Sequence, residues 1–178
     1  MTDNVILIGM PGAGKSTIGV LLAKQLGLDF IDTDLLLQRQ ESLRLQQLIS
    51  LKGLHSFRIA EEQMLLSLNC RSTVIATGGS VIYSEAGMAH LKTLGRLIYL
   101  HISLPQLTQR IADMGERGIL IATGQSFAEL YDERTPLYSR YADIDIEIDG
   151  LSVERVLQKI EKYAQKELDL ARSLSDYP

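Results

Sequence analysis

The sequence has a single cysteine and no hydrophobic run long enough to cross a membrane. One thiol, Cys70, cannot form a disulfide within the chain. A lone cysteine can be a catalytic nucleophile, but it is more often a small packing side chain, which is the interpretation we adopt. No apolar segment approaches the roughly 20 residues of a transmembrane helix, so we expect no membrane association.

Basic residues are not in excess either. The chain has 18 Lys and Arg against 22 Asp and Glu, a net charge of −4. The basic side chains are scattered, so the sequence predicts neither a nucleic-acid surface nor a basic membrane anchor. The three histidines, His55, His90 and His101, lack the spacing of metal ligands, and we interpret them as structural.

The length of 178 residues suits one compact domain spanning residues 1–178, and 46% of the residues are hydrophobic. We find no internal repeat, low-complexity segment or linker. The first expected strand begins within four residues of Met1, which leaves no room for a signal peptide, so we expect a cytoplasmic enzyme. The sequence does not determine the oligomeric state, and a monomer is the starting hypothesis.

A glycine-rich stretch follows the first apolar run. Val5–Ile8 is expected to be a buried strand, and Gly9–Ser16 then reads G-x-x-x-x-G-K-S, the pattern of a phosphate-binding loop between a strand and a helix. Backbone N–H groups and the positive end of the following helix can bind phosphate there. The alternative is an ordinary glycine-rich turn. The loop predicts a nucleoside triphosphate site made by Gly12, Ala13, Gly14, Lys15, Ser16 and Thr17.

Strand and helix patterns alternate along the chain. The expected strands are residues 5–8, 28–31, 73–76, 97–101 and 144–148. Such alternation predicts an α/β fold of three layers (α/β/α), with a five-stranded parallel sheet and ligands at the carboxyl ends of the strands. Acids alternate with isoleucines in the last strand, so we place it at the sheet edge. Two serine-led capping boxes, Ser103 with Gln106 and Ser126 with Glu129, predict helix starts.

Two acids follow the second expected strand. In an extended chain, the spacing of Asp32 and Asp34 puts both side chains on the same side. One could hold Mg²⁺ through a water while the other accepts a proton from an alcohol. The alternative is that Asp34 merely caps the next helix.

Other candidate residues are less specific. Arg58 precedes Glu61 by three residues, which fits a surface ion pair better than an anion-binding arginine held by Glu61. The Gly78-Gly79 pair permits close backbone approach to a ligand, although a plain turn explains it equally well. Arg134 is uninformative by itself.

The segment from Gly115 to Gly124 contains three glycines. Hinge glycines around Arg117 suit a mobile lid, at about residues 113–126, that brings positive charge to a transferring phosphoryl group. The rival interpretation makes Ile119–Ala122 an extra strand.

Together these segments resemble the shikimate kinases, small members of the nucleoside-monophosphate-kinase-like phosphate-loop kinases. The likeness runs from Val5 to about Ile148. Its motifs are Gly9–Ser16, Phe30–Asp34, Phe57-Arg58 with Glu61, Thr77–Gly79, Arg117 and Arg134–Tyr138.

The resemblance implies a phosphate-loop kinase fold with a mobile lid and an acceptor-binding helical insert at about residues 33–62. It implies transfer of the ATP γ-phosphoryl group to the 3-hydroxyl of shikimate, a small anionic alcohol, within aromatic amino-acid biosynthesis. The implied catalytic residues are Lys15, Asp34 and Arg117. The implied acceptor site is Asp34, Arg58, Gly78, Gly79 and Arg134. Arg110 would lie against adenine, Arg117 over the phosphates, and Ser16 and Asp32 would serve Mg²⁺.

The chain departs from the family pattern at three positions near the acceptor or the lid: Leu54, Ser80 and Gly118. It also lacks a proline in the loop after the last strand. A kinase for another small hydroxylated acid or polyol therefore remains an alternative, and an ATPase that switches or assembles a partner is a more distant one.

Overall fold

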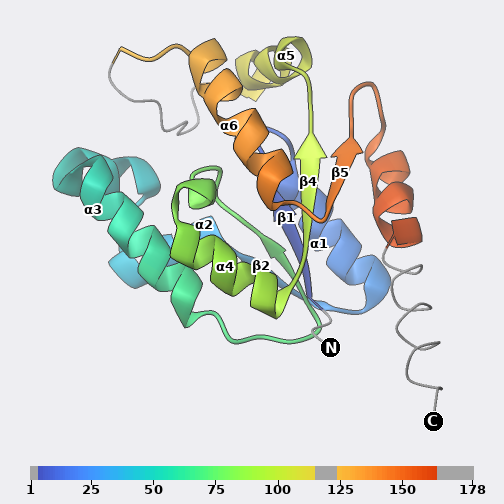
Figure 1. The fold of residues 1–178 in the computed structure, drawn as a ribbon, viewed down its shortest axis with the longest axis horizontal. Helices are drawn as coiled ribbons and strands as arrows, with labels where there is room; N and C mark the ends of the chain where they lie inside the picture. Colours follow the sequence, from blue (N-terminus) through green and yellow to red (C-terminus); the bar gives the residue numbers. More distant parts are fainter. Residues whose placement is uncertain (1–3, 115–123, 164–178) are drawn as a thin grey trace.

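The computed structural model describes residues 4–114 and 124–163 and contains a five-stranded parallel sheet (Figure 1). The strand order is β2-β3-β1-β4-β5. This confirms the predicted α/β class and the edge position of the last strand. The strands are β1 (Asn4–Ile8), β2 (Asp29–Asp32), β3 (Thr73–Ala76), β4 (Gly95–His101) and β5 (Ile144–Glu147).

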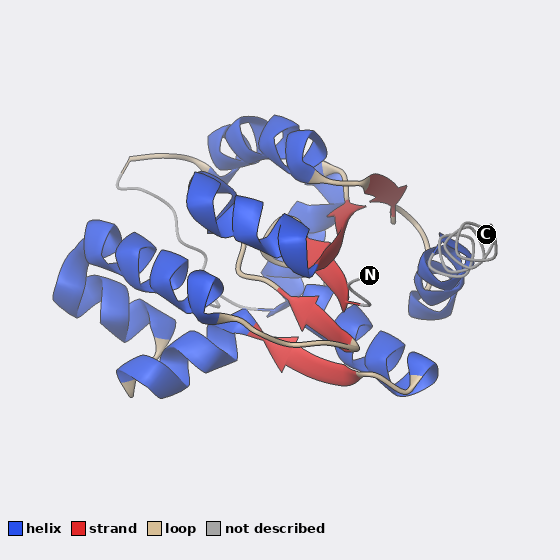
Figure 2. Cartoon of the chain, turned by 60° about the horizontal axis from the view of Figure 1, so that its bottom comes forward, coloured by secondary structure: helices blue, strands red, loops and turns tan. Residues whose placement is uncertain are grey.

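Helices cover both faces of the sheet, because the strand order runs outward from β1 in both directions and right-handed crossovers in opposite directions lie on opposite faces. Helix α1 and the helix at residues 153–163 lie on one face, and α3, α4 and α6 lie on the other (Figures 1 and 2). The helices are α1 (Lys15–Leu26), α2 (Thr33–Glu41), α3 (Leu45–Ser67), α4 (Glu85–Leu94), α5 (Leu104–Met114) and α6 (Phe127–Tyr141), with a 3₁₀ turn η1 (Val81–Tyr83). Within residues 4–114 and 124–163, no helix is long and apolar enough to cross a membrane.

The core lies on the central strands. Every residue of β1 and β3 is buried, and the two strands pair in register from Val5 with Val74. At the edge, Ile146 of β5 is buried while Asp145 and Glu147 are exposed. The alternation of acids and isoleucines thus reflects one covered face and one open face, as predicted.

Local signals explain two of the helix boundaries. Gly53 has φ 79° and interrupts α3 with a kink. Ser126 and Glu129 form the predicted capping box of α6. The box predicted for Ser103 and Gln106 is wrong, because both residues bond to the loop after β5 instead. The Ser103 N–H donates to Asp149 Oδ1 at 2.8 Å, and Gln106 Oε1 accepts from the Gly150 N–H at 3.0 Å.

The amino-terminal ends of three strands are joined by one side chain that the sequence analysis missed. Asn4 is 2% exposed. Its Nδ2 donates to the carbonyl oxygens of Cys70 and Leu94, and its Oδ1 accepts from the Thr73 N–H at 2.9 Å. Cys70 lies at this end of the sheet, and burial raises the pKa of its thiol, which suits a packing role.

Candidate active site

A cavity of about 760 Å³ opens at the carboxyl ends of the strands, within the usual size range for small-molecule sites. It brings together most of the residues that the sequence singled out. Those lining it are Gly12, Ala13, Gly14, Lys15, Ser16, Thr17, Asp34, Gly79, Arg110 and Arg134. The arrangement agrees with the expectation that ligands bind at the carboxyl ends of the strands.

The glycine-rich loop runs directly from β1 into α1. Gly12 and Gly14 have φ of 85° and 92°, a region that side-chain-bearing residues rarely adopt. Gly14 is the residue before the first turn of α1, so the unpaired N–H groups of that turn face the cavity end of the loop. Such an end binds anions, phosphate above all.

Lys15 is buried within this loop, only 8% exposed. Its Nζ donates to the carbonyl oxygens of Gly9 and Met10 at 2.8 and 2.9 Å. Burial lowers the pKa of Lys15 to about 8, and the negative charge of Asp34 opposes that shift. The loop backbone therefore holds the ammonium group at the cavity floor.

Asp34 lies in the first turn of α2 and lines the same cavity as Lys15. Burial raises its pKa to about 6, while Lys15 acts in the opposite direction. A carboxylate of this kind holds a hydroxyl group and accepts its proton more readily than a fully solvated one.

The residue that caps α2 is Asp32 rather than Asp34. Asp32 Oδ1 accepts from the N–H groups of Asp34 and Leu35 at 3.0 and 3.2 Å. The argument from an extended chain is wrong, because the helix begins at Thr33. The two aspartates consequently differ: one side chain bonds to the helix backbone, and the other faces the cavity.

The Gly78-Gly79 turn is approached closely, as its lack of side chains permits, but the neighbouring groups are side chains of the protein itself. A Cβ on Gly78 would lie 2.6 Å from Asp34 Oδ1 and 2.8 Å from Glu61 Oε1. The Gly78 N–H donates to Thr33 Oγ1, and Tyr138 OH donates to the Gly79 carbonyl. Glycine is needed here because two carboxylates flank the turn.

Glu61 is buried beside this turn, at 3% exposure, so its assignment to a surface ion pair with Arg58 is wrong. Both of its carboxylate oxygens accept from Ser80 Oγ at 2.8 Å. Burial raises the pKa of Glu61 to about 7, against the effect of the Ser80 hydrogen bond. The spacing in the sequence showed a helix position but could not show that the helix face was buried.

Arg58 and Arg134 both lie over the ring of Tyr83, a residue that the sequence analysis did not single out. Their Cζ atoms are 4.6 and 5.2 Å from the ring centroid. Arg134 is buried and lines the cavity, whereas Arg58 is exposed and is not among the described residues that line it. Tyr83 thus joins Arg58 to the cavity wall, and no sequence motif indicated this.

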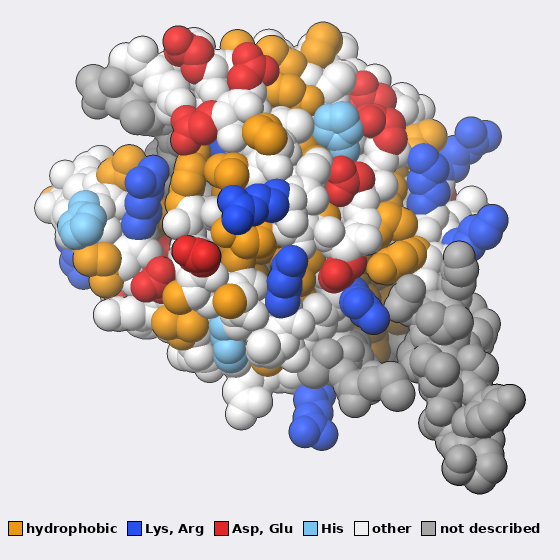
Figure 3. Space-filling model, viewed as in Figure 1, with side chains coloured by type: hydrophobic (Ala, Val, Ile, Leu, Met, Phe, Trp, Pro, Cys, Tyr) orange, Lys and Arg blue, Asp and Glu red, His pale blue; other side chains and the backbone are white. Residues whose placement is uncertain are grey.

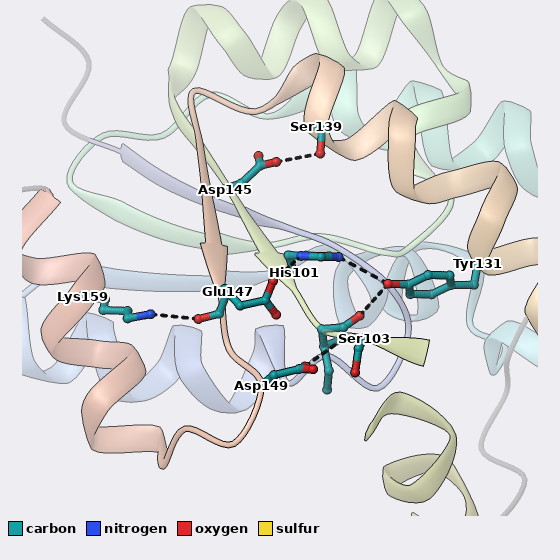
Figure 4. Close-up of polar contacts among 9 residues, drawn as sticks. His101, Ser103, Tyr131, Ser139, Asp145, Glu147, Asp149 and Lys159 are labelled. Atoms are coloured by element: carbon teal, nitrogen blue, oxygen red, sulfur yellow. Dashed lines mark hydrogen bonds and ion pairs between the residues drawn. The ribbon is translucent and has the colours of Figure 1, made fainter. Parts of the chain in front are cut away.

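The cavity lining also includes Arg110 and four apolar side chains, those of Ile148, Leu151, Val153 and Val156. Such a composition suits a flat heteroaromatic base. The loop 149–150 is attached to the start of α5 through Asp149 and Gln106, as described above. Figure 4 shows the neighbouring contacts, in which His101 bonds to Glu147 at 2.6 Å and to Tyr131 at 3.3 Å.

Several predictions fall outside the described residues. Arg117, the alternative strand Ile119–Ala122 and most of the expected lid lie in residues 115–123. Among the described residues, no group of three or more His, Cys, Asp or Glu could hold a metal ion. On the face seen in Figure 3, basic and acidic side chains are interspersed over the described surface, without a continuous basic patch.

Comparisons with known proteins agree with this geometry. The family model for shikimate kinase matches residues 11–165. A shikimate kinase of Francisella tularensis subsp. novicida is 33% identical over 170 residues, 93% of this chain and 97% of its own. One from Thiobacillus denitrificans is 37% identical over 155 residues, covering 85% and 84%.

Solved structures extend the likeness to three dimensions. A shikimate kinase from Acinetobacter baumannii in complex with shikimate has a TM-score of 0.82 at 28% identity, covering 94% of this chain and 95% of its own. The fold is accordingly that of the phosphate-loop kinases, and the chain belongs to the shikimate kinase family.

Proposed function

We propose that this protein transfers the γ-phosphoryl group of ATP to the 3-hydroxyl of shikimate. The observation that carries the proposal is that Lys15 and Asp34 line one cavity, with the buried Arg134 and the backbone of Gly79 in the same wall. A phosphate-binding loop therefore faces a carboxylate that can hold an alcohol. Family membership supports the identity of the acceptor.

The reaction is a direct in-line displacement. A bond forms between the acceptor oxygen and the γ-phosphorus, while the bond from that phosphorus to the bridging oxygen of ADP breaks. The acceptor proton passes to the Asp34 carboxylate, whose raised pKa of about 6 suits transient protonation near neutral pH. Lys15 offsets negative charge on the phosphates, because such transition states depend on positioning and charge neutralisation.

The nucleotide would be held by the loop from Gly12 to Thr17, with Arg110 beside the base. Mg²⁺ in kinases is held mostly by phosphates and water, with one or two protein groups. The residues present fit this pattern, since Ser16 is exposed at the cavity and Asp32 uses one carboxylate oxygen as a helix cap. When bound, the ion would neutralise phosphate charge, with Ser16 and Asp32 as its protein partners.

The acceptor would be held by Asp34 at its hydroxyl groups and by Arg58 and Arg134 at its carboxylate. Arginine suits that task because its planar guanidinium binds carboxylates with two parallel hydrogen bonds. Gly78 and Gly79 would bring backbone close to the acceptor. Arg117, from the lid expected at residues 113–126, would close over the phosphates.

The test is a coupled assay of ADP release with shikimate, quinate and other small hydroxy acids or polyols as acceptors. We expect turnover with shikimate, abolished by chelation of Mg²⁺. Turnover with a different acceptor alone would favour the related kinase activity. ADP release that needs no alcohol would instead favour a nucleotide-driven switch. Size-exclusion chromatography and cell fractionation test the monomer and the cytoplasmic location, which stay predictions.

A further inference from the structure

We propose that Tyr83 is a positioning residue that holds Arg58 and Arg134 together as one carboxylate-binding pair. The inference rests on the proposed function, in which these two arginines bind the acceptor carboxylate. The inference concerns what positions the two arginines, which lie on different helices and differ in burial.

Three separate elements meet at the Tyr83 ring. Arg58 lies on α3, Tyr83 ends η1, and Arg134 lies in α6. The guanidinium carbons of both arginines lie within 5.2 Å of the ring centroid. Two like charges repel, and contact with the same aromatic ring offsets part of that repulsion, because the π-system of the ring attracts cations.

The phenol oxygen adds direction to this arrangement. Arg134 Nε donates to Tyr83 OH at 3.2 Å, and Tyr83 OH in turn donates to Glu133 Oε1 at 2.7 Å. A Cβ on Gly79 would lie 3.3 Å from one terminal nitrogen of Arg134, so the end of the guanidinium lies at the cavity wall. The Tyr83 hydroxyl therefore orients the Arg134 guanidinium through its Nε, and the terminal nitrogens are the atoms left to face the cavity wall.

The more obvious partner of Arg58 is engaged elsewhere. Glu61 is one helical turn away from Arg58, but Ser80 donates to both oxygens of its carboxylate. Arg58 is exposed, and a long exposed side chain samples many rotamers unless a contact limits them. The Tyr83 ring supplies that contact for Arg58, and Arg134 contacts the same ring.

The experiment separates the carboxylate from the rest of the acceptor. Tyr83→Leu and Tyr83→Phe are compared with wild type using shikimate and its methyl ester, which keeps the 3-hydroxyl but lacks the negative charge. For Tyr83→Leu we expect KM for shikimate to rise roughly tenfold, as loss of cation–ring contacts suggests. KM for ATP and KM for the ester should change little. Tyr83→Phe keeps the ring and should show a smaller rise.

Tyr141→Leu is the matched control, because the Tyr141 ring lies 5.8 Å from Lys92 Nζ and is not among the described residues of the cavity wall. It should leave KM for shikimate unchanged. Thermal unfolding checks that each variant is folded, and if Tyr83→Leu is not, the comparison rests on Tyr83→Phe. An unchanged KM for shikimate in the folded variants, or equal losses with acid and ester, overturns the inference. Wild-type protein inactive with shikimate overturns the proposed function as well.

Discussion

The Ser80 hydroxyl donates to both carboxylate oxygens of the buried Glu61, at 2.8 Å to each. A glycine could not supply this donor, and a buried carboxylate without one is costly. Ser80 therefore holds the Glu61 carboxylate beside the Gly78-Gly79 turn.

Glu61→Gln should change how stability depends on pH. The pKa of Glu61 is raised from 4.5 to about 7, so between those values the folded protein binds this proton more tightly than the unfolded chain. The free energy of unfolding consequently falls as the pH rises across that interval. The glutamine variant lacks this penalty and should gain on the order of 2 kcal/mol relative to wild type between pH 5 and pH 8.

Urea unfolding of wild type and Glu61→Gln at pH 5 and at pH 8 measures how the free energy of unfolding of each protein changes with pH. Glu62→Gln is the matched control, because Glu62 also accepts from a serine, Ser84 Oγ at 2.6 Å, and is not among the described residues that line the cavity. Parallel pH profiles for wild type and Glu61→Gln would show that Glu61 is not the source of the dependence.

Asp34→Asn should reduce kcat by about 10²- to 10⁴-fold, because the amide cannot accept the acceptor proton. The affinity for ATP should change little, since the phosphates are held by the loop from Gly12 to Thr17. Stopped assays give kcat, and nucleotide titration gives the Kd. Asp29→Asn, on an exposed residue at the start of β2, the strand that precedes α2, is the control. Equal losses in turnover and ATP affinity would contradict the role given to Asp34.

Gln106→Ala should raise KM for ATP several-fold and leave KM for shikimate unchanged. Gln106 Oε1 accepts from the Gly150 N–H, and Gly150 lies between Ile148 and Leu151, which both line the cavity. Removing one such bond costs about 1 kcal/mol of positioning, which corresponds to roughly a fivefold change. Gln109→Ala, on an exposed face of the same helix, serves as the control. A rise in KM for shikimate, with KM for ATP unchanged, would contradict the assignment of this loop to the nucleotide site.

Asn4→Ala should destabilise the fold by roughly 2–4 kcal/mol, because it leaves three buried or partly buried backbone groups of neighbouring segments without their partner. Urea unfolding measures the loss, and the activity of the folded fraction should be retained, since Asn4 lies at the end of the sheet away from the cavity. Asn69→Ala, at an exposed position nearby, should change stability by less than about 0.5 kcal/mol. If Asn4→Ala also changed stability by less than about 0.5 kcal/mol, the role of Asn4 in joining the three strands would be contradicted.

Local features of the sequence were enough to predict the nucleotide site and the parallel sheet of this protein. The strand before the loop, the glycines at positions 12 and 14 and the lysine that follows predicted a nucleotide site, because backbone conformation and phosphate binding depend on neighbours in the chain. Alternating strands and helices predicted the parallel sheet and the edge at which ligands bind.

The partners of individual side chains were decided only by the tertiary structure. Gln106 had a plausible local partner in Ser103 but bonds to Gly150, and Glu61 had one in Arg58 but accepts from Ser80. Tyr83 carried no motif at all. Such contacts join segments far apart in the sequence, and burial of a polar group is satisfied by whichever donor the packing brings near it. Spacing along the chain cannot identify that donor, because the distance that matters is the one across the fold.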